Sequence, residues 1–367
     1  MPERSAQEFL RRSGWGDASV TPLPGDASTR RYARLQLGGR SALLMDQPQN
    51  SETPAAPEQA SAAERQALGY NAVARLAGAD TRRFQAVAEH LLAHGLAAPQ
   101  ILAADHAHGY VILEDFGDAL FADVLADGGA EEELYKAAVE VLARLHAQPA
   151  PSRIGGLPLY KYDETALLAE TELLPEWFVP LALGRAATAT ERAEHRALWR
   201  TALDSIAGHD QVLVHRDYHA QNLIWMPQRP GHGRVGLIDF QDAVAGSRAY
   251  DLVSLIKDAR RDVSPQVAER ATAHYLAAMQ AQGTALDEAG LRTEMAVMAA
   301  QRNAKIVGIF ARLYKRDGKP RYLALLPRVW GHLERDLMHP ALAQLRDWYD
   351  RTIPGQLRLP LAEEETL

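Results

Sequence analysis

The chain has 367 residues, more than one compact core usually holds, so the sequence predicts two lobes or domains. Hydrophobic residues make up 47% and charged residues 24%, the ordinary balance of a soluble globular protein. The net charge of −7 argues against nucleic acid as a partner, and the absence of cysteine excludes disulfides, thiolate catalysis and cysteine-based metal sites.

The start of the chain carries charges where a signal peptide needs an apolar core. No run reaches the roughly 18 apolar residues that a membrane span requires. We therefore expect a cytoplasmic protein that has no membrane partner.

Short apolar runs separated by turns predict strands in the first part of the chain. Residues 20–46 contain two such runs joined by Gly38-Gly39, and "PQILAAD" and "GYVILED" (99–115) form another pair around the turn "HAHG". Residues 47–63 are rich in Pro, Gln, Ser and Ala and predict a loop. These patterns predict a small β-rich N-terminal lobe over residues 1–115.

Helical patterns interrupt these strands and then dominate the rest of the chain. An Ala-rich piece at 64–77 precedes "TRRFQAVAEHLLAHG", for which Thr81 is the expected N-cap and Gly95 the expected stop. From residue 116 to residue 367 the pattern is mostly helical. The predicted class is therefore α+β, with a β-rich N-terminal lobe and a mostly helical C-terminal lobe.

The exception in the helical part is the stretch "VLVHRDYHAQNLIW" (212–225), a polar loop between apolar runs. It contains His215, Asp217 and Asn222, and "IDFQD" follows with Asp239. One carboxylate can orient and deprotonate an attacking hydroxyl, while a second carboxylate and an amide oxygen can hold Mg²⁺ against nucleotide phosphates. This spacing predicts phosphoryl transfer.

"HRDYHAQN" and "IDFQD" together resemble the catalytic and metal-binding loops of the eukaryotic-kinase-like superfamily, which includes aminoglycoside phosphotransferases and choline kinases. The resemblance implies a two-lobed protein-kinase-like fold that uses ATP and Mg²⁺. It also implies that Asp217 is the catalytic base, that Asn222 and Asp239 are metal ligands, and that His215 braces the loop.

Several departures favour the small-molecule branch of this superfamily. His219 stands where a protein kinase usually has Lys, Gln241 replaces the Gly of the metal loop, and no Ala-Pro-Glu follows. Blocks such as "LLAETELLPEWFV" and "GIFARLYKRDGKPRYL" resemble bacterial N-acetylmuramate/N-acetylglucosamine anomeric kinases of cell-wall recycling. That resemblance implies transfer of phosphate to the C1 hydroxyl of an amino sugar.

The superfamily's phosphate-binding lysine is missing. No lysine precedes Lys136, and the strand "SALLMD" has Met45 or Asp46 at that point. The helix position of its glutamate partner falls near Phe84. We expect Arg30 or Arg31 to meet the phosphate charge, together with backbone N–H groups of "GDAST" and the hydroxyls of Ser28 and Thr29.

The remaining candidate contacts concern the adenine and the acceptor. "VILEDFGD" resembles the hinge between lobes, where adenine would meet backbone groups near Glu114 and Phe116. A sugar needs polar acceptors and an aromatic face, and an N-acetylmuramate carboxylate would need a cation. The candidates for these acceptor contacts are Glu170, Glu172, Trp177 and Arg302.

Other interpretations remain open from the sequence alone. The same fold could phosphorylate an aminoglycoside, choline or homoserine, and the missing lysine could indicate a non-catalytic, pseudokinase-like binding protein. We expect a monomer whose partners are a nucleotide and a small amino sugar.

Overall fold

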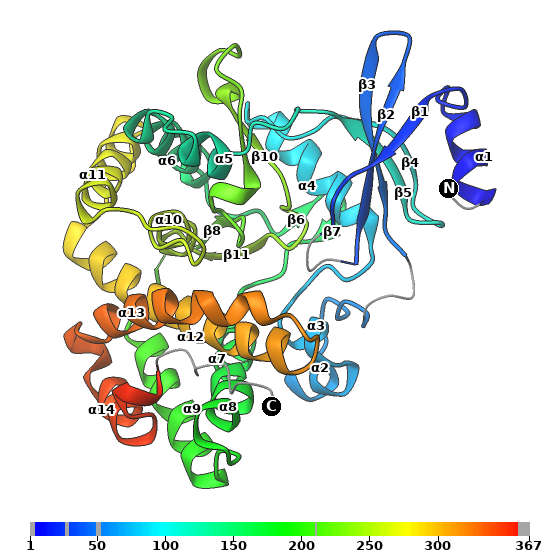
Figure 1. The fold of residues 1–367 in the computed structure, drawn as a ribbon. Coiled ribbons are helices and arrows are strands. Elements are labelled where there is room, and N and C mark those ends of the chain that lie inside the picture. The colour runs from blue at the N-terminus through cyan, green and yellow to red at the C-terminus, as the bar shows by residue number, and fades with distance from the viewer. Residues whose placement is uncertain (1–3, 26–28, 49–52, 210, 359–367) are drawn as a thin grey trace. The chain divides into compact units, whose positions relative to one another are not determined.

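The computed structural model describes residues 4–25, 29–48, 53–209 and 211–358. The chain divides into two compact units, which Figure 1 draws together and which are treated separately below. The first contains Met1–Leu145, Pro151–Lys161 and His215–Val244, and the second contains His146–Ala150, Tyr162–Val214 and Ala245–Leu367. This division groups residues by the contacts that they make and does not test the lobe boundary predicted at residue 115, which stays a prediction.

A five-stranded antiparallel sheet of order β1-β2-β3-β5-β4 forms much of the first unit. Its strands are β1 (Ser19–Pro22), β2 (Arg31–Leu37), β3 (Arg40–Asp46), β4 (Ile101–Asp105) and β5 (Tyr110–Glu114). Gly38 and Gly39 adopt φ values of 54° and 80°, which a two-residue hairpin of this kind requires and which glycine adopts without strain. The strands predicted from the sequence are confirmed.

Alternate residues of these strands bury one face of the sheet against α1 (Arg4–Arg12). Phe9 of the helix stacks on Tyr110 at 5.9 Å between ring centroids, and Leu35 and Ile112 are fully buried beside them. The remaining elements of the unit are α2 (Ala62–Leu68), α3 (Tyr70–Val73), α4 (Thr81–Ala93), α5 (Phe121–Ala126), α6 (Glu131–His146), β6 (Arg153–Ile154), β7 (Leu157–Pro158), β9 (Leu223–Trp225) and β10 (Val235–Leu237).

The ends of α4 show one error in the sequence prediction. Asp80, not Thr81, is the N-cap, because the Asp80 carboxylate accepts a hydrogen bond from the Arg82 backbone N–H at 3.0 Å. Thr81 is instead the first helical residue and is buried. Gly95, with φ 75°, ends the helix as predicted.

The second unit is mostly helical and is organised around the 28-residue helix α12 (Glu288–Lys315). Gly308 allows the helix to approach the π-helical turn Leu174–Phe178, because a Cβ at residue 308 would lie 2.3 Å from the Leu173 carbonyl carbon. Its other elements are α7 (Glu164–Thr171), α8 (Val179–Leu183), α9 (Ala189–Asp204), β8 (Gln211–Val214), β11 (Val244–Ser247), α10 (Ala249–Ile256), α11 (Pro265–Ala281), α13 (Leu326–Leu337) and α14 (Ala343–Thr352). The sheet of the first unit and the helices of the second confirm the α+β class.

Candidate active site

A short β-hairpin in the first unit brings the two predicted loops together. β9 begins directly after Asn222, and β10 ends two residues before Asp239. The strands pair with Leu223 opposite Leu237, and the Ile238 N–H donates to the Asn222 carbonyl at 3.2 Å. Backbone hydrogen bonds therefore fix two loops side by side: residues 215–222, called the catalytic-type loop below, and residues 238–242, called the metal-type loop.

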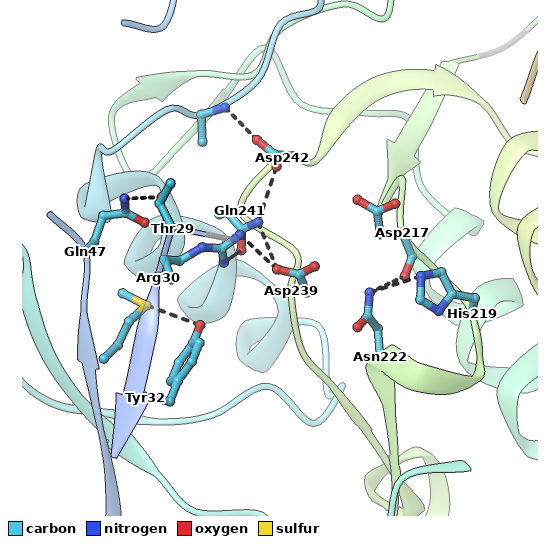
Figure 2. A network of polar contacts seen from close by, with 12 residues as sticks. Thr29, Arg30, Tyr32, Gln47, Asp217, His219, Asn222, Asp239, Gln241 and Asp242 are labelled. Carbon is cyan, nitrogen blue, oxygen red and sulfur yellow. Dashed lines mark hydrogen bonds and ion pairs between the residues drawn. The ribbon is translucent and has the colours of Figure 1, made fainter. Parts of the chain in front are cut away.

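The polar residues of the first loop are arranged around the backbone of Asp217. The Asn222 Nδ2 donates to the Asp217 carbonyl at 3.0 Å, and the His219 N–H donates to the same oxygen at 3.1 Å. Figure 2 shows the Asp217 carboxylate directed away from both side chains. Within the described part of the chain no hydrogen bond or ion pair engages this carboxylate, which leaves it able to accept a proton.

Two residues of these loops hold left-handed backbone conformations. Arg216 has φ 82° and Asp239 has φ 64°, a region that costs a non-glycine residue about 1–3 kcal/mol. The buried Arg216 guanidinium offsets part of this cost because its Nη2 donates to the Ala74 carbonyl at 2.8 Å. Such strain is concentrated at functional sites and here turns both loops sharply.

Aromatic contacts hold the metal-type loop from behind. Phe240, the residue after Asp239, stacks on Phe84 of α4 at 4.8 Å between ring centroids and 27° between ring planes. His215 lies edge-on to Phe240 at 6.4 Å and to Tyr218 at 5.6 Å, and it is 1% exposed. Phe84 stands near the position expected for the superfamily's helix glutamate, so an apolar stack connects the helix to this loop.

Arg30 forms an ion pair with Asp239. Its Nη2 lies 3.0 Å from Asp239 Oδ1, and its Nη1 donates to Gln241 Oε1 at 2.6 Å. Gln241 Nε2 donates in turn to Asp239 Oδ1 at 3.1 Å, which closes a three-residue network (Figure 2). Burial alone would raise the pKa of Asp239, but the Arg30 charge and the Gln241 hydrogen bond lower it below its usual value, so the carboxylate is ionised at neutral pH.

Arg30 and Asp239 line a pocket of about 590 Å³ that lies entirely within the first unit. That volume falls within the range of about 300–1,000 Å³ that is usual for small-molecule sites. Most of its walls are apolar, and its polar lining includes Arg30, Asn222 and Asp239. The apolar lining residues are Leu23, Pro24, Leu43, Phe84, Pro99, Leu113, Phe116, Leu120, Ala122, Ile224 and Ile238.

The two predicted hinge residues also line this pocket. Glu114 Oε1 pairs with Arg229 Nη2 at 2.6 Å, and the Glu114 backbone N–H donates to the Gln100 carbonyl at 2.9 Å. Phe116 packs against Gly236, where a Cβ would lie 2.7 Å from the Phe116 ring. Since the Glu114 N–H is already used, any backbone pairing with adenine depends on the Glu114 carbonyl and on residues 115–116.

The residues predicted to contact the phosphates have different surroundings in the structure. Arg30 lines the pocket, whereas Arg31 is 68% exposed and pairs with Asp46 at 3.4 Å where β2 begins and β3 ends. Thr29 Oγ1 accepts a hydrogen bond from Gln47 Nε2 at 3.2 Å. Ser28 lies outside the described residues. Arg30 is thus the arginine of this pair that lies beside the predicted metal ligands.

The residues present fit a divalent cation that is shared with phosphates. Asp239 Oδ2 and Asn222 Oδ1 are hard oxygen donors, and among the described residues neither atom has a hydrogen-bond donor. The described residues contain no cluster of three or more His, Asp or Glu side chains that could hold an ion. Carboxylate and amide oxygens of this kind can hold a divalent cation together with water and nucleotide phosphates.

The predicted acceptor residues lie in the second unit and make mostly internal contacts. Glu170 is fully buried, with Lys305 Nζ at 3.0 Å and Gln301 Nε2 at 3.1 Å, and it accepts a further hydrogen bond from Tyr162. Glu172 has Arg196 Nη1 at 3.7 Å; burial raises its pKa and Arg196 opposes this rise. These two carboxylates are held largely by their own unit.

The other two acceptor candidates differ from the carboxylates. Trp177 is half-buried in the π-helical turn. Arg302 is 5% exposed in α12, and its buried Nη1 has no hydrogen-bond partner among the described residues. A buried, unsatisfied guanidinium nitrogen is costly, so Arg302 is the acceptor candidate whose chemistry most needs an anionic partner.

Sequence reasoning missed two contributors to the site. The sequence identifies Gln241 only as a departure from glycine, whereas in the structure Gln241 connects Arg30 to Asp239. Arg34 lines the pocket and pairs with Asp115 at 2.8 Å and with Asp118 at 2.7 Å, connecting β2 to the hinge segment. For Arg34, the acids of "EDFGD" (Asp115 and Asp118) are a signal in the sequence that could have indicated its ion pairs. For Gln241, no local pattern indicates its contacts.

The comparison with protein families assigns this chain to the phosphotransferases. Residues 19–291 match the model of the phosphotransferase enzyme family, and the chain belongs to this family. It is therefore an enzyme of the kinase type with a hydroxyl acceptor, which argues against the non-catalytic alternative.

Two curated relatives and one solved structure refine this assignment. The chain is 44% identical to N-acetylmuramate/N-acetylglucosamine kinase of Caulobacter vibrioides, covering 97% of this chain and 98% of the relative. It is 31% identical to the protein of the same name from Pseudomonas putida, over 94% and 92% of the two chains. A choline/ethanolamine kinase family protein from Mesorhizobium loti has a TM-score of 0.55 at 13% identity, over 95% and 99% of the chains, which confirms the protein-kinase-like fold.

No helix among the described residues combines the length and the apolar character that crossing a membrane would require.

Proposed function

We propose that this protein is an ATP- and Mg²⁺-dependent kinase that phosphorylates the anomeric C1 hydroxyl of N-acetylmuramate, N-acetylglucosamine or both. The observation that carries the proposal is the 44% identity over nearly the whole chain to a relative named for these two sugars. Structures at 13% identity support only the fold, so they favour no aminoglycoside, choline or homoserine acceptor.

Asp217 acts on the acceptor hydroxyl. Its carboxylate has no partner among the described residues, and its backbone is fixed by Asn222 and His219, so it can orient the hydroxyl and accept its proton as the bond to phosphorus forms. Correct placement of the attacking oxygen supplies much of the acceleration in phosphoryl transfer.

Asn222 and Asp239 would hold the divalent cation, which when bound supplies positive charge against the nucleotide phosphates. Asn222 contributes a neutral ligand because its Nδ2 is committed to the Asp217 carbonyl, which leaves Oδ1 for the metal. Asp239 contributes an ionised carboxylate whose Oδ1 faces Arg30 and Gln241.

The pocket of the first unit receives the nucleotide. Its apolar walls surround the base near Glu114 and Phe116, while Arg30 and Thr29 meet the phosphates at the end marked by Asp239. Arg30 is the cation on that side because it pairs with Asp239, whereas the other arginine that lines the pocket, Arg34, pairs with Asp115 and Asp118 of the hinge segment. A planar guanidinium suits phosphate oxygens well.

In the second unit, Arg302 is our candidate for the carboxylate that distinguishes N-acetylmuramate from N-acetylglucosamine. Glu170, Glu172 and Trp177 remain candidates for sugar contacts, and the internal partners of the two acids make them weaker ones. The protein is proposed to act as a monomer in the cytoplasm.

The test is an incubation with ATP, Mg²⁺ and each sugar, followed by ³¹P and ¹H NMR of the product. The expected product is a sugar 1-phosphate, recognised by coupling between phosphorus and the anomeric proton. The control is the methyl glycoside of N-acetylglucosamine, whose C1 oxygen is blocked and which should not react. Phosphorylation of that glycoside would contradict the C1 assignment, and no phosphorylation of either free sugar would sink the proposal.

A further inference from the structure

Gln241 connects Arg30 with Asp239, two charged residues that line the pocket of the first unit. It is 7% exposed and lies within the metal-type loop, 211 residues from Arg30 in sequence. Its Oε1 accepts from Arg30 Nη1 at 2.6 Å, and its Nε2 donates to Asp239 Oδ1 at 3.1 Å. A carboxamide can satisfy a cation and an anion at once because it carries both an acceptor and donors.

We propose that Gln241 is a positioning residue that makes Arg30 the phosphate-binding cation of this kinase. The inference rests on the proposed nucleotide-dependent activity and goes beyond it by assigning a role to a residue that contacts neither substrate. Gln241 acts on the nucleotide only through the side chains it holds.

The need for such a residue follows from where Arg30 originates. The chain has no lysine before Lys136, so strand β3 supplies no lysine for the phosphates, and its arginine, Arg40, lies over the Trp15 ring at 4.8 Å from the ring centroid. Arg30 instead precedes β2 outside any regular element, where backbone pairing alone does not fix a long side chain. Immobilising an arginine costs side-chain entropy, so a cation held in place before the nucleotide binds loses less on binding.

The geometry also explains how Asp239 can serve two partners. Arg30 and Gln241 both bond to Oδ1, which turns the carboxylate so that Oδ2 remains for the cation. Gln241 Nε2 also lies 3.3 Å from Asp242 Oδ2, and Asp242 Oδ1 accepts from the Ala77 backbone N–H at 2.6 Å. Gln241 is therefore held in place itself, through Asp242 and the Ala77 backbone.

The test measures binding of ATP and of adenosine separately, by calorimetry without an acceptor sugar. Gln241→Ala should weaken ATP binding about tenfold, the range for disturbing a charge-assisted hydrogen bond, and should leave adenosine binding unchanged. Loss of general structure would weaken both ligands equally. Gln241→Met, which keeps the side-chain size, is measured in the same way in case the alanine variant does not fold.

Double variants provide the second measurement. Because Gln241 acts through Arg30, the Arg30→Ala/Gln241→Ala protein should bind ATP no more weakly than Arg30→Ala alone. The matched controls are Arg31→Ala, at an exposed neighbouring arginine, and Gln85→Ala, at a glutamine whose side-chain amide donates to Glu89 on α4. Both controls should bind ATP as the unaltered protein does.

An unaltered ratio of ATP affinity to adenosine affinity in the Gln241 variants would overturn the inference, as would full additivity in the double variant. Failure of the proposed function looks different, because the unaltered protein would then bind ATP no better than adenosine. The two failures can thus be told apart in a single series.

Discussion

The candidate residues of the two units differ in what their functional atoms do. In the first unit, Asp217 keeps its carboxylate clear of other described groups, and Asn222 and Asp239 each retain an oxygen without a donor. In the second unit, the Glu170 carboxylate is surrounded by Lys305, Gln301 and Tyr162. Residues available for chemistry are thus distinguished from residues that stabilise a core by whether their polar atoms are already satisfied.

The strongest challenge to this comparison is Asp239→Ala. We expect turnover that depends on the divalent cation to be abolished, because the ionised metal ligand and the partner of Arg30 are lost together. Kinase activity is measured against Mg²⁺ concentration, with Asp17→Ala, at an exposed residue before β1, as the control. An unchanged metal dependence would remove Asp239 from the ligand set.

Asp217→Asn should have the next largest effect. The amide of the variant cannot take up the proton of the attacking sugar hydroxyl. We therefore expect kcat to fall by at least about 100-fold, the range for losing general-base assistance. The melting temperature and ATP binding should hardly change, since no described residue bonds to this carboxylate. Asp127→Asn, at an exposed residue after α5, is the control, and wild-type turnover in the Asp217 variant would refute the base assignment.

Glu170→Gln sharpens the comparison from the side of the second unit. Removing the charge leaves Lys305, which is 13% exposed, without its carboxylate, so we expect a loss of about 3 kcal/mol in the free energy of unfolding. The sugar KM should change little. Denaturant unfolding and initial rates measure the two quantities, with the exposed Glu176→Gln as the control. A raised sugar KM at unchanged stability would return Glu170 to the acceptor site.

Arg302→Gln should have the smallest overall effect and a selective one. If its guanidinium meets the N-acetylmuramate carboxylate, kcat/KM for that sugar should fall about tenfold relative to N-acetylglucosamine, as expected for one charge-assisted hydrogen bond. Competition between the two sugars in one reaction measures this ratio directly. An equal loss for both sugars would assign Arg302 to packing within α12.

The sequence predicted much of the strand pattern and the loop pair, since these depend on local spacing. Asn222 and Asp239 converge because one short hairpin separates them, and their residue types already indicated the chemistry. The Arg30–Gln241 contact joins residues 211 positions apart, and no local pattern could indicate it. The burial of Glu170 was equally hidden, because the helical pattern alone did not show which face of α7 packs inward.

The stack of Phe84 on Phe240 has a consequence for how the metal-type loop responds to its surroundings. An ion pair in this place would weaken as ionic strength rises, and a charge-altering modification nearby could break it. Two buried rings are indifferent to both and lose contact strength mainly on cooling. The contact between α4 and the metal-type loop should therefore be permanent and should not respond to ionic strength.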